Sequence, residues 1–350
     1  MKLNSILVFC CQAAIASALP TSHQEPSFNW EEINFFLAFG DSYTFVHGTA
    51  GLENYSFIGD NFDFSFTPQQ LLTNEIVQDQ LGTSAGGPNW VEYLTGCFSG
   101  LPSKCKKQLW DFAFAGSDVS TIFTPLHHNY TVSFVNQILQ WNLYARPVIP
   151  VDTTKALVAV FIGINDISDS EKYTFPRNNA TDFASFYQEI IETEFEALET
   201  VYNAGYRNYL FMNLPPLDRT PANVLPNATI LPSHSMLQTY NNLLSTASNT
   251  FASTHPGTKT MLFDTYSYLS AILDDPSKYG IKNTTGYCPN YDAPDIDTDW
   301  ANIKFGKISL FKTQYTQSLR HKQLRREATN GYQREKPYSA QYPDQTKLGS

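Results

Sequence analysis

A hydroxyl, a backbone N–H and a carboxamide in this sequence are placed where they could act together in nucleophilic catalysis. Ser42 ends a Gly-Asp-Ser sequence directly after an apolar run, and a serine hydroxyl there can act as a nucleophile. Gly116 and Asn165 follow two further apolar runs, and a backbone N–H and a carboxamide could stabilise the oxyanion of acyl transfer. Taken singly, each has a plainer interpretation: a common turn at Ser42, a strand-end turn at Gly116 and a helix cap at Asn165.

The apolar runs that precede these groups predict the strands that would position them. Each run is too short and too continuously apolar for an amphipathic helix, and Val, Ile and Phe dominate. The five predicted strands cover residues 35–39, 109–114, 156–162, 209–212 and 261–263. Helical segments separate several of them, which indicates a parallel sheet covered on both faces, with sites at the carboxyl ends of the strands.

Three segments between the strands have the period of a helix. The first presents Val132, Val135, Ile138 and Leu139 on one face. The others span residues 183–201, which we expect to end at Gly205, and residues 237–251. Because no repeat or Gly/Ser linker interrupts residues 30–300, we predict a single domain over that range.

The motifs around Ser42, Gly116 and Asn165, in this order, resemble the GDSL esterase and lipase superfamily, also called SGNH hydrolases. The Gly-Ile-Asn-Asp sequence at residues 163–166 is the most specific of them. With the segment at residues 88–94, the chain is similar to fungal secreted members of carbohydrate esterase family sixteen, which remove acetyl groups from sugars. The resemblance implies an α/β fold, a flavodoxin-like three-layer α/β/α sandwich with a five-stranded parallel sheet.

The resemblance also implies a serine mechanism that needs a general base. Ser42 would attack the ester carbonyl, while its own N–H, the N–H of Gly116 and the side chain of Asn165 hold the oxyanion. The family's base is a histidine near the C-terminus, usually three residues after an acid. None of the seven histidines has an acidic residue at that position, and His321, in the expected part of the chain, lies in a basic segment.

The charge distribution separates the last 50 residues from the rest. The formal net charge is −10, but residues 301–350 carry a net +7 and residues 1–300 a net −17. We expect this basic tail to be disordered, or an aberrant replacement of the family's C-terminus through retained intron sequence or a shifted reading frame. The alternative is a genuine divergent tail on a binding protein. If the family's C-terminus has been replaced, the chain as written should have very low esterase activity, because the histidine base is lost with it.

Several features predict a secreted protein. Residues 1–18 have the pattern of a signal peptide, with an apolar stretch followed by an Ala-Ser-Ala cleavage site. The apolar stretch is too short to span a membrane. Sequons for glycosylation occur at Asn54, Asn129, Asn179, Asn227 and Asn283. Cys97 and Cys105 could form a small disulfide in an oxidising compartment, which leaves Cys288 unpaired.

We therefore predict an extracellular, monomeric serine esterase that acts on a small ester or acetylated carbohydrate. The alternatives are a non-catalytic carbohydrate-binding protein on the same scaffold and a lipase for longer acyl chains. The acidic composition argues against a nucleic-acid partner. We expect no cofactor and no metal site, because the histidines lack paired ligand spacing, and we expect a solvated role for the loop residues His127 and His128.

Overall fold

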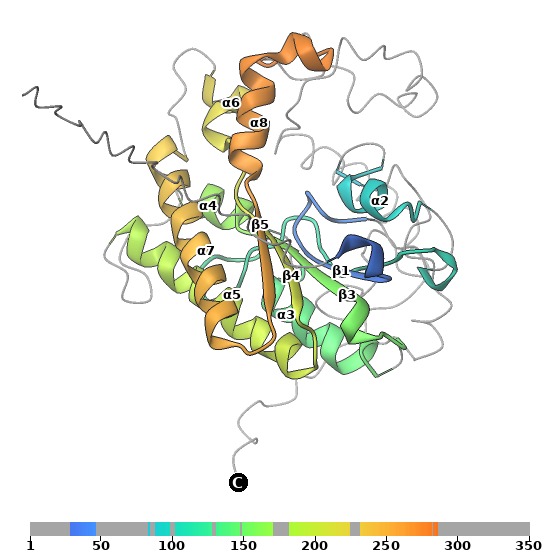
Figure 1. The fold of residues 1–350 in the computed structure, drawn as a ribbon. Coiled ribbons are helices and arrows are strands. Elements are labelled where there is room, and N and C mark those ends of the chain that lie inside the picture. The colour runs from blue at the N-terminus through green and yellow to red at the C-terminus, as the bar shows by residue number, and fades with distance from the viewer. Residues whose placement is uncertain are drawn as a thin grey trace, which may run out of the picture.

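A computed structural model describes most of the chain between residues 29 and 285. The described residues are 29–46, 83–84, 88–98, 102–127, 131–147, 149–170, 182–224, 232–281 and 283–285. They contain a five-stranded parallel sheet in the order β2-β1-β3-β4-β5 (Figure 1). The strands are β1 (Phe35–Gly40), β2 (Gln108–Asp111), β3 (Ala156–Phe161), β4 (Asn208–Met212) and β5 (Lys259–Phe263). The predicted parallel α/β sheet is confirmed.

The second strand ends three residues earlier than its apolar run predicts. It stops at Asp111, yet the chain stays beside β1: the N–H of Phe112 donates to the Ala38 carbonyl at 2.7 Å, and that of Phe114 donates to the Gly40 carbonyl at 3.0 Å. The segment from Phe112 to Phe114 is buried, which explains why its sequence is as apolar as a strand. The chain therefore reaches Gly116 alongside the end of β1.

Helices cover both faces of the sheet. Phe39 packs against Phe134 at the start of α3 (Phe134–Gln140), while Phe36, three residues earlier on β1, contacts Trp90 of α2 (Trp90–Thr95). Residues three apart on a strand point to opposite faces, so α2 and α3 lie on opposite sides. The long helices α5 (Phe183–Asn203) and α7 (His234–Thr254) pack against each other on the α3 side (Figure 1).

The remaining elements are short. Three helices are α4 (Ile164–Ser170), α6 (Pro221–Val224) and α8 (Thr265–Asp274). Single turns of 3-10 helix lie at Trp30–Glu32, Pro102–Lys104, Thr153–Lys155, Leu217–Arg219 and Pro276–Tyr279, and a π-helical turn at Trp141–Ala145. In Figure 1, α8 extends from the carboxyl end of β5 and marks the edge of the sheet where parallel strands present functional groups.

The face that α3 buries differs from the predicted one. Phe134, Gln137 and Ile138 are buried, whereas Leu139 is 47% exposed and Val135 is only partly covered. The sequence pattern placed Leu139 inside because it follows Ile138, but the buried face advances by three or four residues and passes from Ile138 to Trp141. The predictions for α5 and α7 are confirmed, and α5 ends before Gly205, which has a φ of +101°.

Some features predicted for a secreted protein lie within the described residues. Cys97 and Cys105 form the predicted disulfide, and Asn283 of the last sequon is exposed. The other four sequons, residues 1–18, Cys288 and the tail at 301–350 lie outside the described residues. Among the helices of the described residues, none combines the length and apolar character needed to cross a membrane.

Candidate active site

The three candidate residues lie at the carboxyl ends of three neighbouring strands. Ser42 is buried in the turn after β1, Gly116 follows the extension of β2, and Asn165 is buried in the first turn of α4, directly after β3. Because β1 lies between β2 and β3, the chain leaves β1 in one direction to form β2 and returns on the other side for β3. Such a change of direction opens a crevice outside the strand ends.

The turn that carries Ser42 depends on the glycine before it. Gly40 has a φ of +150°, and a Cβ there would lie 3.0 Å from the carbonyl carbon of Phe161 on β3 and closer still to its oxygen. Only glycine permits this approach of the two strands. The carboxylate of Asp41 then accepts the N–H of Tyr43 at 2.9 Å, which closes a tight turn around Ser42.

Asn165 and Asp166 hold the segment that follows Gly116. The side-chain amide of Asn165 donates to the Ser117 carbonyl at 2.8 Å, and the Asp166 carboxylate accepts the N–H of Val119 at 2.9 and 3.1 Å. Gly116 itself adopts a φ of +81°. A carboxamide has two N–H groups, so Asn165 retains one donor beyond its bond to Ser117. The Asn-Asp sequence thus connects the start of α4 to the loop that carries Gly116.

The side chain of Gln137 on α3 connects the turn that carries Ser42 to the loop that carries Gly116. Its side chain accepts the N–H of Gly40 at 3.0 Å and donates to the Gly40 carbonyl at 2.8 Å, so it closes off the end of β1. It also donates to the Ser117 hydroxyl at 3.0 Å, and that hydroxyl donates to the Val132 carbonyl at 2.9 Å. Our sequence analysis missed Gln137; the available signal was a glutamine beside Ile138 on the buried face of an amphipathic helix.

Buried carboxyl groups surround these loops. Burial raises the pKa of Asp41 to about 8, against the hydrogen bond from Tyr43, and the nearby Asp166 raises it further. Burial likewise raises the pKa of Asp166 to about 7, opposed by the hydrogen bond from Val119. Burial raises the pKa of Glu194 on α5 to about 8, and the charge of Asp166 adds to the effect. The site is therefore built over acids that resist ionisation.

These buried acids make stability depend on pH, and Glu194→Gln tests this. Glu194 is 1% exposed and its Oε2 has no hydrogen-bond partner. Because the pKa of Glu194 is higher in the folded state than in the unfolded state, its contribution to the free energy of unfolding is fully present at low pH. That contribution is lost as the pH rises from about 4.5 to 8. Each such acid can cost up to about 1.4 kcal/mol per pH unit in this range.

We expect the melting temperature of the wild type to fall between pH 5 and pH 8, and that of Glu194→Gln to fall less. Thermal unfolding at pH 5, 6.5 and 8 measures both. Glu196→Gln, an exposed position on the same helix, serves as the matched control and should follow the wild type. An equal fall in Glu194→Gln and the wild type would contradict the assignment.

The glycine of the Gly-Ile-Asn-Asp motif is required for packing, and we expect Gly163→Ala to destabilise the fold. Gly163 has a φ of +107°, and a Cβ there would lie 2.6 Å from the ring carbon Cζ of Tyr240 and closer to its hydroxyl. Tyr240 is fully buried, so its ring cannot move freely. Backbone strain and overpacking together should lower the free energy of unfolding by about 3 kcal/mol or more.

Urea unfolding measures this loss, and Gly96→Ala separates its two causes. Gly96 also has a positive φ, +70°, but a Cβ there would meet nothing within 4 Å. This control should lose only about 1 kcal/mol, from backbone strain alone. A loss in Gly163→Ala no larger than that in Gly96→Ala would show that Tyr240 accommodates the methyl group.

The described histidines differ in their relation to the site. His127 packs beside Gly116, with its Cβ 3.3 Å from the position of a Cβ on Gly116, and its Nε2 pairs with the Asp169 carboxylate. The expectation of a solvated role for His127 is therefore wrong, because a contact 42 residues away in sequence partly buries the ring. His128 and His321 lie outside the described residues.

The other two described histidines lie at opposite ends of α7. His234 at the start contacts Asp218 and Tyr266, and His255 at the end pairs with Glu199. Because α7 runs back toward the amino end of β5, His255 lies at the edge of the sheet away from Ser42. Among the described residues, no histidine nitrogen hydrogen-bonds to the Ser42 hydroxyl.

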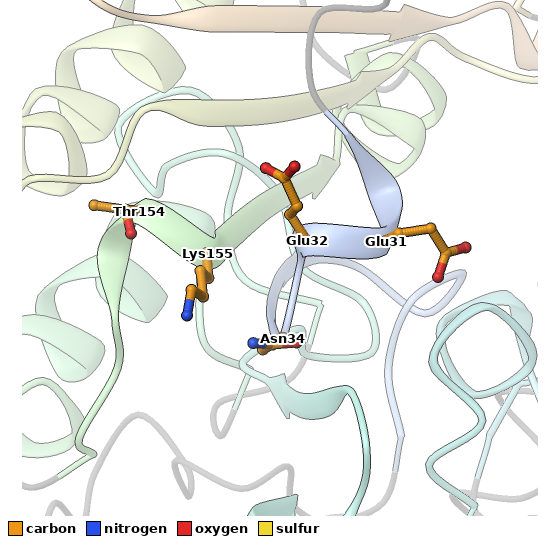
Figure 2. A pocket seen from close by; sticks show the side chains of 5 residues that line it. All are labelled: Glu31, Glu32, Asn34, Thr154 and Lys155. Carbon is orange, nitrogen blue, oxygen red and sulfur yellow. The ribbon is translucent and has the colours of Figure 1, made fainter.

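A surface hollow lies at the amino end of the sheet. Its lining residues precede β1 and β3: Glu31, Glu32, Asn34, Thr154 and Lys155. Figure 2 shows their side chains pointing in different directions rather than toward a common point. The hollow is therefore at the edge opposite Ser42 and offers no converging groups for catalysis.

Sequence comparisons show which known proteins this chain is similar to. A sequence model described as GDSL-like Lipase/Acylhydrolase matches residues 36–303, which include all three motifs. An acetylesterase of Thermothelomyces thermophilus is 28% identical over 210 residues, or 59% of this chain and 66% of that protein. GDSL esterase/lipase 1 of Arabidopsis thaliana is 27% identical over 145 residues, or 39% of this chain and 37% of that protein.

The matched region thus spans less than two thirds of the length of each of these relatives. Among solved structures, BT4096, a gut microbial diltiazem-metabolizing enzyme, is similar with a TM-score of 0.32 and 12% identity over 70% of this chain and 40% of that chain. That similarity is too distant to bear on the site. The family model, in contrast, matches well over half of the chain, in a range that contains Ser42, Gly116 and Asn165, and the protein belongs to the GDSL-like lipase/acylhydrolase family.

Proposed function

We propose that this protein is a secreted serine esterase that hydrolyses acetyl esters of carbohydrates. One observation carries the catalytic part of the proposal: Asn165 and Asp166 both hydrogen-bond the segment after Gly116, at the strand ends next to Ser42. This arrangement supports an oxyanion site beside a serine. Family membership supports ester hydrolysis as the reaction class.

The proposed reaction proceeds through an acyl-enzyme. The Ser42 hydroxyl oxygen attacks the ester carbonyl carbon and gives up its proton to a base. The carbonyl oxygen becomes an oxyanion that accepts hydrogen bonds from the N–H of Ser42, the N–H of Gly116 and the free N–H of Asn165. The alcohol of the sugar leaves with a proton, and water then cleaves the acetyl-serine to release acetate and regenerate Ser42.

The base for Ser42 has to come from outside the contacts described above. A serine hydroxyl at its ordinary pKa is a poor nucleophile, so a proton acceptor is required for rapid turnover. In the family this acceptor is a histidine near the C-terminus, and the segment where it would occur lies outside the described residues. We assign no residue of this chain to that role.

The substrate class rests on similarity and charge. The acetylesterase of Thermothelomyces thermophilus supports an acetyl group as the acyl part. The net charge of −10 favours an uncharged ester over an anionic one, since like charges repel at long range. A carbohydrate as the alcohol part follows from the resemblance to family sixteen.

Rates on a series of esters test this proposal. The purified protein is incubated with aryl acetate, aryl octanoate and acetylated xylo-oligosaccharide, and the released products are measured. We expect aryl acetate to be cleaved at least about tenfold faster than the octanoate, and acetate to be released from the oligosaccharide. Faster cleavage of the octanoate would favour a lipase, and binding of the oligosaccharide with no cleavage of any ester would favour a carbohydrate-binding protein.

Secretion is supported by two features of the described residues. A disulfide such as Cys97–Cys105 persists in oxidising compartments, and the exposed sequon at Asn283 is accessible to glycosylation. The signal-like residues 1–18 agree with both. Expression from the full sequence in a fungal host should deliver a glycosylated protein to the medium, and retention of an unglycosylated chain inside the cells would contradict secretion.

A further inference from the structure

Three side chains of metal-ligating type come together beside Gly116. Asp118 follows Gly116 by two residues, His127 lies nine residues further along the same loop, and Asp169 lies on α4 one turn after Asn165. One ligand atom from each lies within 4.8 Å of the others. Nothing in the spacing of the sequence indicates this cluster, because Asp169 is 42 residues from His127 and meets it only through the fold.

Asp118 is the member of the cluster that needs an explanation. It is 2% exposed, and both of its carboxylate oxygens are buried with no hydrogen-bond partner among the described residues. The Thr124 hydroxyl is close enough to lower the pKa of Asp118, but the two do not meet hydrogen-bond geometry, and that hydroxyl is also unpartnered. Leaving such a carboxylate buried and unsatisfied is costly.

The acidic surroundings of Asp118 increase the cost of ionising its buried carboxyl group. Besides burial, Asp166, Asp169 and Asp41 all raise the pKa of Asp118. Among the ion pairs of the described residues, none brings a lysine or arginine to Asp118 or Asp166. The cluster therefore brings two buried carboxyl groups and an imidazole together, which is a set of ligands that a bound cation would satisfy.

We propose that Asp118, His127 and Asp169 bind a divalent transition-metal ion, with Zn²⁺ as the preferred ion. An imidazole nitrogen with carboxylate oxygens suits Zn²⁺, which binds such atoms at about 2.0–2.2 Å and is commonly held by three protein ligands plus water. Ca²⁺ takes six to eight oxygen ligands, far more than the two carboxylates here supply.

Small side-chain rotations complete the site. Ligand atoms around tetrahedral Zn²⁺ lie roughly 3.4 Å apart, as their bond lengths of about 2.1 Å require. Ligand atoms that now lie within 4.8 Å of one another must adjust to reach that spacing, and His127, whose side chain is 20% exposed, has the most room to move. The same exposure provides a path for the ion from solvent. A bound ion would tie the loop of residues 116–127 to α4, and so fix Gly116 relative to Asn165.

Metal binding itself is the test, and it does not depend on esterase activity. The full protein is stripped with EDTA, transferred to metal-free buffer and titrated with Zn²⁺ by calorimetry, with Co²⁺ absorption as a spectroscopic probe of the ligands. We expect one Zn²⁺ per chain, weaker binding of Ca²⁺, and a melting temperature raised by about 5 °C at Zn²⁺ well above Kd. No saturable binding of Zn²⁺ to the stripped protein would overturn the proposal.

Variants assign the ligands. His127→Gln and Asp118→Asn should each weaken Zn²⁺ binding by about 100-fold or more, since each removes one of three ligands. His234→Gln is the matched control: His234 also pairs with an aspartate, Asp218, but lies at the start of α7 away from the cluster. Because Asp118 is buried, His127→Gln gives the result if Asp118→Asn does not fold. Unchanged Zn²⁺ affinity in His127→Gln, or equal weakening in His234→Gln, would overturn the assignment.

Discussion

Ser42→Ala should lower the rate of aryl acetate hydrolysis by about 10³-fold and remove the acyl-enzyme. Without the hydroxyl no acetyl-serine can form, and the remaining hydrolysis is attack by water at the oxyanion donors. Loss of the nucleophile costs about 10⁶-fold in subtilisin, where the base is fully engaged. We expect a smaller loss here because no histidine of this sequence matches the family's pattern for that base.

Two measurements on the same variants check this expectation. The first is kcat/KM on aryl acetate, and the second is mass spectrometry of the protein after mixing, which detects one acetyl group on wild type and none on Ser42→Ala. Ser253→Ala, at an exposed position on α7, is the matched control and should keep both signals. An acetylated Ser42→Ala protein, or equal rates in Ser42→Ala and wild type, would refute the serine mechanism.

The predictability of the fold follows from local sequence patterns. Continuous apolar runs predict the five strands. For β1 to β4 the reason is that a parallel strand buried on both faces tolerates few polar residues, whereas β5 lies at the edge of the sheet and leaves Met261 and Phe263 38% exposed. The positions of Ser42, Gly116 and Asn165 follow from the same pattern, since each comes directly after an apolar run and carboxyl ends of parallel strands share one edge. Leu139 was misplaced because two adjacent apolar residues leave the phase of a short helix ambiguous.

The groups that support the site could not be found in this way. Gln137 hydrogen-bonds to Gly40, which is 97 residues away in the sequence, and Asp169 contacts His127, which is 42 residues away. Polar residues at such positions look like ordinary surface residues in the sequence, and only the fold shows that they are buried. Glu194 is a similar case, because the glutamates around it on α5 reach the surface while its own side chain is enclosed.

Asn165→Ala should lower kcat for aryl acetate by about 100-fold with little change in KM. Removal of one oxyanion-hole donor costs about 10²–10³-fold in kcat, because that donor is stronger toward the charged transition state than toward the substrate. The variant also loses the hydrogen bond to the Ser117 carbonyl, which should lower the free energy of unfolding by about 1 kcal/mol. The catalytic loss must therefore be separated from a structural one.

Asn208→Ala makes that separation. The Asn208 amide donates to the Ala156 carbonyl at 3.0 Å and is buried like Asn165, but it lies at the amino end of β4, the opposite edge of the sheet. It should lose a similar amount of stability with kcat unchanged. If Asn165→Ala retained the wild-type kcat, or if Asn208→Ala lost as much activity, Asn165 would only position the Gly116 loop. A selective fall in kcat identifies the second N–H of Asn165 as the donor that meets the oxyanion.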